Sequence, residues 1–305
     1  MLAVIGALIA NGLITVLKFI GAFITGSSGM LAEAFHSLAD TTNQVFLLLG
    51  LRFYKKPASK KHPFGYGKER FFWSFIAAIF IFGVGATFAI YEGIAKIRVP
   101  HEPDHLIWAY GILGVSFILE AISIGIALYQ EVGEARHEKM SFFEYLRESK
   151  DPTAKTVIYE DSAALVGIVI AAAGLYLGEI HAWPGDGRYW DGIASMMIGV
   201  ILAIVAFALA RSARGLLLGE AATPKSTRAI REAIKAHPNV EGVVELLTMH
   251  LAPKQILVNA HVNLKDELTT TEIVTTIREI EKEILKAEPM VHRIFLEAAD
   301  TKGNI

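Results

Sequence analysis

Six apolar stretches dominate the first 217 residues of this chain, and each is long enough to cross a lipid bilayer. A membrane-spanning helix needs about 20 predominantly apolar residues. The stretches lie at about residues 2–25, 30–53, 70–96, 105–130, 153–178 and 189–215. Gly and Ala recur through them, and small residues let helices pack closely in lipid. We therefore predict a polytopic α-helical membrane domain with six transmembrane helices over residues 1–217.

The charge of the whole chain and its lack of cysteine narrow the possible functions. Basic and acidic residues nearly balance, giving a net charge of -2 over 305 residues, so the chain has no nucleic-acid signature. The sequence contains no cysteine, which excludes disulfides and thiolate metal sites. Histidine nitrogen and carboxylate oxygen remain as the ligand types for a metal.

Basic residues are concentrated in alternate loops. The loop between the second and third stretches carries Arg52, Lys55, Lys56, Lys60, Lys61, Lys68 and Arg70, and the opposite loops carry Lys96, Arg98 and Arg188. Cytoplasmic loops are enriched in Lys and Arg. We expect both termini on the cytoplasmic side of a bacterial or archaeal inner membrane, or on the equivalent side of an organelle membrane. Because the chain opens in an apolar stretch without a basic leader, we expect no secretory signal or transit peptide.

Ionisable residues interrupt the second and fifth apolar stretches. His36 and Asp40 are four residues apart, so on a helix they lie on one face, one turn apart. Glu160 and Asp161 form an acidic pair in the fifth stretch. Ionisable side chains are costly in hydrocarbon and usually mark a function, and imidazole and carboxylate are ligands for divalent metals. We therefore predict an intramembrane metal site of His36, Asp40, Asp161 and Glu160.

The same residues also have structural interpretations. His36 and Asp40 would then be a buried hydrogen-bonded pair that fixes helix packing. Glu160 would be an exposed residue near a helix start, where the helix dipole favours negative charge. Ser or Asn would make such a packing pair at lower cost than two ionisable groups, which favours the metal site.

Four further polar residues are candidates for carrying protons, for metal access or for supporting the site. Glu33 and Asn43 share the face of His36 at helical spacing. Glu33 is a candidate access residue or proton acceptor, or else a carboxylate that reaches the outer headgroups. Lys18 either snorkels to the membrane interface or forms a salt bridge with Glu33. Glu120 lies among apolar neighbours, and we expect it to pair within the bundle or to bind the metal directly.

The composition changes after about residue 220, where shorter elements are predicted. Residues 224–237 and 269–286 read as helices, and residues 242–251, 255–264 and 291–297 read as strands. The order α-β-β-α-β predicts a small sheet covered on one face by helices, in a cytoplasmic domain over residues 221–300. About 80 residues fold only marginally alone, so pairing with a second copy would stabilise them.

The chain resembles the cation diffusion facilitator family across nearly its whole length. The matching pieces are His36-Ser37-Leu38-Ala39-Asp40, His62-Pro63-Phe64-Gly65-Tyr66-Gly67-Lys68, Glu160-Asp161-Ser162-Ala163-Ala164 and the α-β-β-α-β tail. Residues 140–152 are similar to the zinc transporter nine branch of that family. The resemblance implies a homodimer, six transmembrane helices, a cytoplasmic ferredoxin-like domain and exchange of a divalent cation for protons.

The resemblance also implies a transport site built from two residues four apart on the second span and two on the fifth. His36 and Asp40 match the first pair, and Asp161 matches the second member of the other pair. The remaining position falls at Val157, which cannot bind a metal. We expect Glu160, a water molecule or a residue from another helix to complete the ligands.

Two accessory metal sites of the family have only partial matches here. In the inner loop, His62 matches one of two histidines and Tyr66 stands at the other, so we expect no metal there. In the tail, His261 lies near a matching position, but Phe295-Leu296-Glu297-Ala298 occupies the stretch where other ligands would fall.

These features predict a divalent metal/proton antiporter that exports metal, with zinc as the first candidate, from the cytoplasm by alternating access. Metal ligands must be deprotonated and imidazole titrates near neutral pH, so metal and protons compete. Manganese, iron or cobalt could replace zinc as the cargo. A membrane metal sensor and an intramembrane metallohydrolase are two further candidate functions. The chain has no His-Glu-x-x-His signature, so we predict no enzyme and no resident cofactor.

Overall fold

The computed structural model describes residues 2–137, 140–181 and 187–299, with the backbone alone at residues 2–7, 9–10 and 153–154. The chain forms two compact units. The first contains Met1–Phe53 and Arg70–Arg214, and the second contains Tyr54–Glu69 and Gly215–Ile305. The predicted domains, 1–217 and 221–300, differ from these units chiefly in the loop of residues 54–69, which clusters with the second unit.

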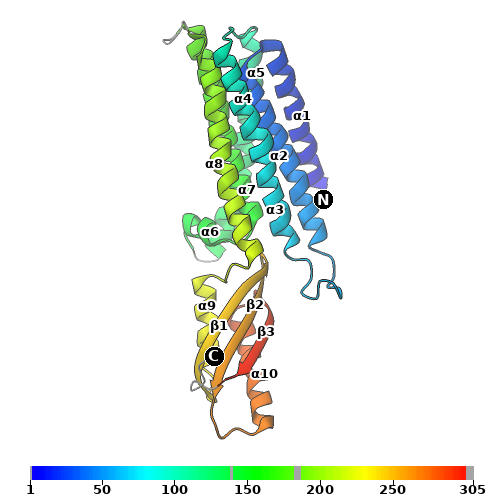
Figure 1. Ribbon diagram of the computed structural model, residues 1–305, viewed down its shortest axis with the longest axis vertical. Coiled ribbons are helices and arrows are strands. Elements are labelled where there is room, and N and C mark those ends of the chain that lie inside the picture. The colour runs from blue at the N-terminus through cyan, green and yellow to red at the C-terminus, as the bar shows by residue number, and fades with distance from the viewer. Residues whose placement is uncertain (1, 138–139, 182–186, 300–305) are drawn as a thin grey trace. The chain divides into compact units, whose positions relative to one another are not determined.

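Long helices make up the first unit (Figure 1). They are α1 (Leu2–Thr25), α2 (Ser28–Phe53), α3 (Glu69–Phe80), α4 (Thr87–Arg98), α5 (Leu106–His137), α7 (Pro152–Glu179) and α8 (Trp190–Leu218), with the short α6 (Phe142–Glu148) between α5 and α7. The helix positions predicted from the apolar stretches are confirmed. Helix α5 continues to His137, beyond the apolar stretch predicted at about residues 105–130, because hydropathy marks the apolar layer and a helix can continue beyond it with polar residues.

The third predicted helix contains an irregular turn. Residues Ile81–Ala86 form a π-helical segment that joins α3 to α4 within one continuous helix. The amide of Thr87 donates to the carbonyl of Phe82, one residue farther back than in an α-helix. Hydropathy does not report such a turn, so the sequence predicted an unbroken α-helix here.

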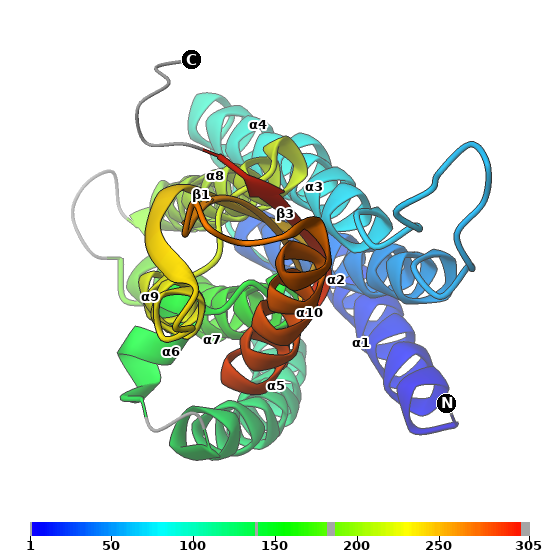
Figure 2. The ribbon, with the colours of Figure 1, turned by 90° about the horizontal axis from the view of Figure 1, so that it is seen from below.

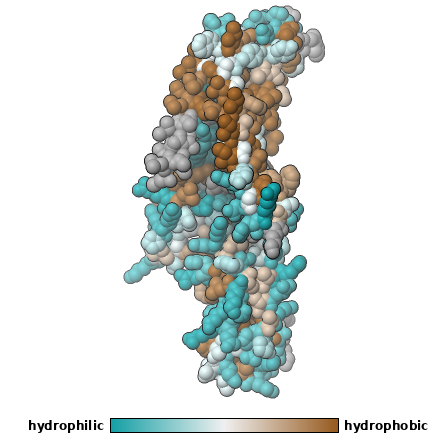
Figure 3. Space-filling view, turned by 180° about the vertical axis from the view of Figure 1, so that it is seen from behind, coloured by the Kyte–Doolittle hydropathy of each residue, from teal (hydrophilic) through white to brown (hydrophobic). Residues whose placement is uncertain are grey.

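Four helices of the described residues are long and apolar enough to cross a membrane. They are Glu69–Arg98, Leu106–His137, Lys155–Glu179 and Trp190–Leu218. In α1 the apolar helix is shorter, Asn11–Thr25, and falls below that length. In α2 the ionisable residues lower the hydropathy. Figure 3 shows apolar residues gathered over the helical unit on the face in view. The first unit is therefore a helical membrane domain.

Helix α2 lies inside the bundle, where it packs against α1, α4 and α7. Figure 2, seen from below, shows these helices nearly end on. Alanines such as Ala32, Ala89 and Ala171 are fully buried where the helices meet. Their small side chains let the helix axes approach closely, which brings the polar residues of α2 next to those of α7.

The second unit holds a three-stranded mixed sheet and two helices. Its elements are α9 (Pro224–Lys235), β1 (Val240–Ala252), β2 (Gln255–Leu264), α10 (Thr270–Ala287) and β3 (Val291–Ala298). The strand order is β1-β2-β3, with β1 antiparallel and β3 parallel to β2. The predicted α-β-β-α-β order and the small sheet are confirmed, and the ferredoxin-like assignment stays a prediction.

Alternation along β2 explains how this sheet is covered. Every second residue, including Ile256 and Val258, is fully buried and packs with Ile230 of α9 and Ile280 of α10. The other face of β2 is half-buried, so both helices cover the same face of the sheet. Each helix starts at a threonine cap, Thr223 for α9 and Thr269 for α10.

Three contacts explain why residues 54–69 belong to the second unit. The ring of Phe64 meets that of Phe295 edge-on, with centroids 6.5 Å apart. Lys68 Nζ donates to the carbonyl of Leu217 over 3.2 Å. Gly67 also packs so closely that an added Cβ would collide with the backbone of Leu251.

Candidate metal site

One face of α2 carries the four polar residues that the sequence placed together. Glu33, His36 and Asn43 are at most 3% exposed, and Asp40 is partly buried. Their spacing of three, four and three residues keeps them on one side of the helix. The predicted row of side chains therefore faces the interior of the bundle.

Helix α7 brings its acidic pair against this row. Asn43 Nδ2 donates to Glu160 Oε2, and the carboxyl groups of Asp40 and Glu160 lie close enough to interact. Asp161 is close enough for its charge to act on Asp40. Two carboxylates that lie so close repel each other unless a proton or a cation lies between them. Glu160, although about 100° around the helix from Asp161, thus lies against α2.

Two neighbouring helices supply hydrogen-bond donors that the sequence analysis did not select. Asn11 Nδ2 of α1 donates to Asp40 Oδ2 over 3.3 Å, and Ser123 Oγ of α5 donates to Asp161 Oδ2 over 2.8 Å. The available signal was a single polar residue inside each apolar stretch. Ser and Asn are common enough in such helices that the signal alone identifies no site.

The described side chains do not form a complete set of metal ligands. Among them, no group of three or more His, Asp or Glu is arranged to hold a metal ion. Asp40 and Asp161 each direct one oxygen to an amide or hydroxyl donor, which satisfies that oxygen. The structure therefore brings Asp40, Glu160 and Asp161 together, while His36 Nδ1 has no hydrogen-bond partner among the described residues.

Several buried polar atoms around this cluster have unused hydrogen-bonding capacity. Among the described residues of α2 and α7 they are Glu33 Oε1, His36 Nδ1, Ser37 Oγ, Asn43 Oδ1 and Glu160 Oε1. Such atoms are rare in folded proteins and call for an ion, a proton or a water molecule. A nitrogen donor with several carboxylate oxygens fits a divalent cation. The arrangement is thus suited to bind such a cation or to exchange protons.

The predicted salt bridge between Lys18 and Glu33 is confirmed. Lys18 Nζ lies 3.0 Å from Glu33 Oε2, and both side chains are fully buried, so Lys18 does not snorkel to the interface. The other oxygen of Glu33 points at α7, where an added Cβ on Gly167 would collide with it. Glu120 of α5 is partly buried and interacts through its charge with Lys18 and Asp40.

A second buried polar cluster, which the sequence analysis missed, lies at the start of α2. Asp191 Oδ1 accepts from Ser27 Oγ over 2.6 Å and from the Gly29 amide over 3.0 Å. Asp191 Oδ2 accepts from the Ser28 amide over 2.7 Å, and Lys96 Nζ lies 3.4 Å from it. This carboxylate caps the N-terminus of α2, and its hydrogen-bonding capacity is filled.

The two accessory sites have ordinary contacts. The rings of His62 and Tyr66 lie 4.5 Å apart, centroid to centroid. His261 Nδ1 lies 3.7 Å from Glu245, and its Nε2 lies 3.4 Å from Glu297. Because the two carboxylates approach opposite nitrogens of the ring, they do not converge with His261 on one ion.

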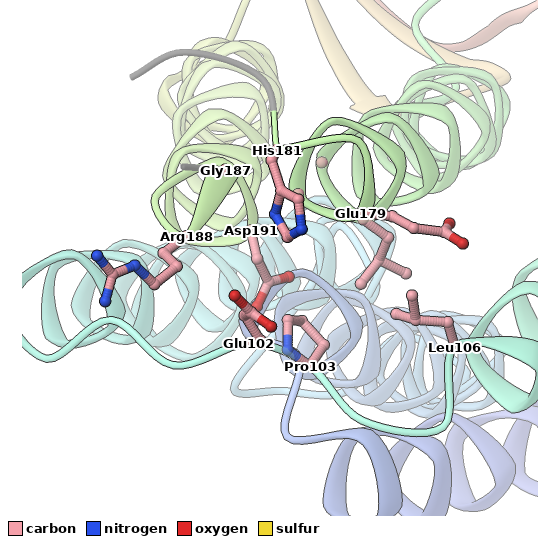
Figure 4. A pocket seen from close by; sticks show the side chains of 11 residues that line it. Glu102, Pro103, Leu106, Glu179, His181, Gly187, Arg188 and Asp191 are labelled. Carbon is pink, nitrogen blue, oxygen red and sulfur yellow. The ribbon is translucent and has the colours of Figure 1, made fainter. Parts of the chain in front are cut away.

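A pocket of about 160 Å³ lies away from the acidic cluster (Figure 4). Glu102, Asp191 and His181 are among the residues that line it. Its lining includes Gly174, thirteen residues beyond Asp161 on α7, which is about 20 Å along the helix. The pocket is therefore separate from the predicted metal site.

Comparison with protein families covers nearly the whole chain. Residues 4–218 match the cation efflux transmembrane domain, and residues 222–297 match the cytoplasmic domain of cation efflux proteins. The second unit therefore corresponds to a cytoplasmic domain.

Several curated proteins are similar to this chain. The proton-coupled zinc antiporter SLC30A9, mitochondrial, of Homo sapiens is 31% identical over 87% of this chain and 46% of its own length. Metal tolerance protein C4 of Arabidopsis thaliana is 31% identical over 87% of this chain and 57% of its own. The cation-efflux pump FieF of Citrobacter koseri is 25% identical over 94% of this chain and 88% of its own length. The chain thus spans about half the length of the first two relatives.

Proposed function

The chain belongs to the cation efflux family of membrane transporters, also called cation diffusion facilitators, and we propose that it exchanges a divalent metal ion, with zinc as the first candidate, for protons. The observation that carries this proposal is the cluster of Asp40, Glu160 and Asp161 beside His36, with unused hydrogen-bonding capacity in the bundle interior. Because the family and the relatives are transporters, a metallohydrolase is excluded.

Competition for the same atoms would couple the two ions. Asp40 and Glu160 interact closely, so any proton that they share has to leave before a metal ion binds, since metal ligands bind deprotonated. His36 supplies the nitrogen ligand, and Asp40 and Asp161 supply oxygens. Glu160 or a water molecule takes the position that Val157 cannot fill. Protons arriving from one side then release the metal, and alternating access resets the site.

The architecture that we propose has six spans, with α3 and α4 forming a single one. Both termini face the cytoplasm, and metal ions are exported from the cytoplasm. The cytoplasmic domain has a ferredoxin-like topology and pairs with a second copy. The basic loops and the α-β-β-α-β element order support this arrangement. The relatives named as zinc transporters and the nitrogen ligand favour zinc, while the carboxylates leave manganese, iron and cobalt as competitors.

Transport by the purified chain in liposomes tests the proposal. Under an imposed pH gradient, we expect zinc to enter in exchange for protons, and we expect manganese, iron and cobalt to compete less well. His36→Ala should abolish metal-driven proton flux while the protein remains folded. Metal binding without any flux would point to a sensor instead, and full flux in His36→Ala would refute the site.

A further inference from the structure

Two lysine–carboxylate pairs are buried in the described part of the helical unit. Lys18 and Glu33 join α1 to α2, and Lys96 and Asp191 join α4 to α8. Their side chains are all 3% exposed or less. Removing two charges from water is expensive, and apolar residues of similar volume often serve stability equally well. Each pair therefore needs a reason beyond the mutual attraction of its two charges.

The reason for the Lys96 pair is structural and visible. Lys96 Nζ also donates to the carbonyl of Gly26 over 2.8 Å, and Asp191 caps the start of α2. Other charges that act on Lys96 come from Glu92 and Asp104, near the same end of the helices. This pair fastens helix ends together.

The Lys18 pair has different surroundings. Among the described residues, Glu33 is the one hydrogen-bond partner of Lys18, and it lies one turn before His36 on α2. The charge of Lys18 acts on His36, Asp40 and Glu120 as well as on Glu33. Lys18 therefore places a fixed positive charge beside the candidate ligands.

Glu33 reduces the effect of the Lys18 charge on the candidate ligands. One of its oxygens is bound to Lys18, while the other has no partner among the described residues and points toward Gly167 on α7, the helix of Glu160 and Asp161. Gly167 is required for this position, since an added Cβ would occupy it. The carboxylate lies between α2 and α7, the helices that carry the candidate ligands. From there it offsets part of the positive charge of Lys18.

We propose that Lys18 is a built-in counter-charge that weakens the hold of the transport site on a divalent cation, and that Glu33 shields the site from part of this charge. The inference rests on the proposed function. A dry site lined by several carboxylates would bind a dication tightly and release it slowly, because electrostatic attraction is strong at low dielectric. A fixed ammonium nearby reduces that attraction and makes release possible.

The two partners should act on metal binding in opposite directions. Binding of Zn²⁺ to the purified full chain in nanodiscs is measured at pH 8, where fewer protons compete for the ligands. We expect Lys18→Met to tighten binding and Glu33→Gln to weaken it, each by about tenfold, from the effect of one unit charge on a nearby dication. The double variant, which restores the net charge, should return close to the wild-type affinity.

Matched variants separate this role from a structural one. Lys96→Met removes a lysine from the other buried pair, so it should lower the unfolding temperature and leave Zn²⁺ affinity unchanged. Glu33→Asp keeps a carboxylate but withdraws it by one methylene, so it should weaken binding even if Glu33→Gln fails to fold. Lys18→Arg keeps the charge and should bind like the wild type.

The outcomes also distinguish this inference from the proposed function. If Lys18→Met and Glu33→Gln shift affinity in the same direction, or if Glu33→Asp binds like the wild type, the counter-charge role is overturned while transport stands. If the wild type binds no Zn²⁺, manganese or cobalt, the proposed function itself fails. An affinity change in Lys96→Met as large as that in Lys18→Met would likewise overturn the inference.

Discussion

The polar clusters at the start and in the middle of α2 are similarly buried but differ in how fully their hydrogen bonds are used. At the start, both oxygens of Asp191 accept hydrogen bonds and Lys96 neutralises its charge. In the middle, His36 and Glu160 each keep a buried polar atom without a partner among the described residues. Burial of charge alone therefore does not mark a transport site, and we expect the site where buried ionisable groups also keep unused hydrogen-bonding capacity.

The largest effect that separates the two clusters is loss of transport. Asp40→Asn keeps the size of the side chain but removes the charge that a dication requires. We expect metal-driven proton flux in liposomes to disappear, with little change in the unfolding temperature. Asp191→Asn is the control in the same assay, because its folded fraction should still transport. Full flux in Asp40→Asn would contradict the idea that the middle cluster, unlike the cluster at the start of α2, is the transport site.

The next largest effect is on stability and belongs to the saturated cluster. Asp191→Ala removes the cap of α2 and leaves Lys96 buried without its carboxylate. Breaking one side of a buried pair costs about 3–5 kcal/mol, so we expect a loss of this size in the free energy of unfolding, measured by denaturant titration in detergent. The remaining folded protein should bind Zn²⁺ as the wild type does. A loss below about 1 kcal/mol would contradict the structural role, given the usual cost of removing a helix cap alone.

The sequence predicted the middle cluster better than the cluster at the start of α2, and the reason is local. His36 and Asp40 reveal their shared face through their spacing, and Lys18 and Glu33 through their comparable depth in adjacent helices. Asp191, by contrast, looks like an ordinary acidic residue in the first turn of a helix. Its hydrogen-bond donors at the start of α2 lie more than 160 residues earlier in the chain, and no local pattern connects them.

The fold shows the same division between local and distant information. Helix and strand positions follow from apolar periodicity, so they were predicted closely. The orientation of Glu160 toward α2 and the hydrogen bonds from Asn11 and Ser123 depend on how four helices pack together. Likewise, the polar loop of residues 54–69 gave no sign in its sequence that it packs with the second unit.

A smaller effect is expected where the carboxylate of Glu33 packs against Gly167 of α7. In Gly167→Ala, the new methyl group displaces the carboxylate of Glu33, and overpacking of this kind costs about 1–3 kcal/mol. Because the displaced carboxylate shields Lys18 less, we also expect weaker Zn²⁺ binding. The control is Gly199→Ala, which meets the backbone of α4 and η1, the π-helical segment Ile81–Ala86, and touches no ionisable group. It should cost stability without changing affinity.

The smallest effect concerns a polar pair that is satisfied but exposed, at the start of α10. Thr269 and Glu272 form a reciprocal capping box, in which the Thr269 amide donates to Glu272 over 2.8 Å. Hydrogen bonds from Thr269 lower the pKa of Glu272 below its usual 4.5. The stabilisation from this carboxylate is therefore present above that usual pKa and is lost as the pH falls through the lowered value.

Hydrogen exchange at the start of α10 in the full chain measures this effect directly. At pH 7, Glu272→Ala should exchange faster than the wild type at residues 270–274, and the difference should shrink as the pH falls through the lowered pKa of Glu272, which an NMR titration of the wild type measures. The substitution should not change metal affinity over this pH range. The carboxylate of Glu272 is bonded to Thr269 and leaves no capacity for an ion. If the difference persisted below the measured pKa, the ionised carboxylate would not be the stabilising group. Satisfied hydrogen bonds would then stabilise this exposed cap without the charge, unlike the buried cap at Asp191.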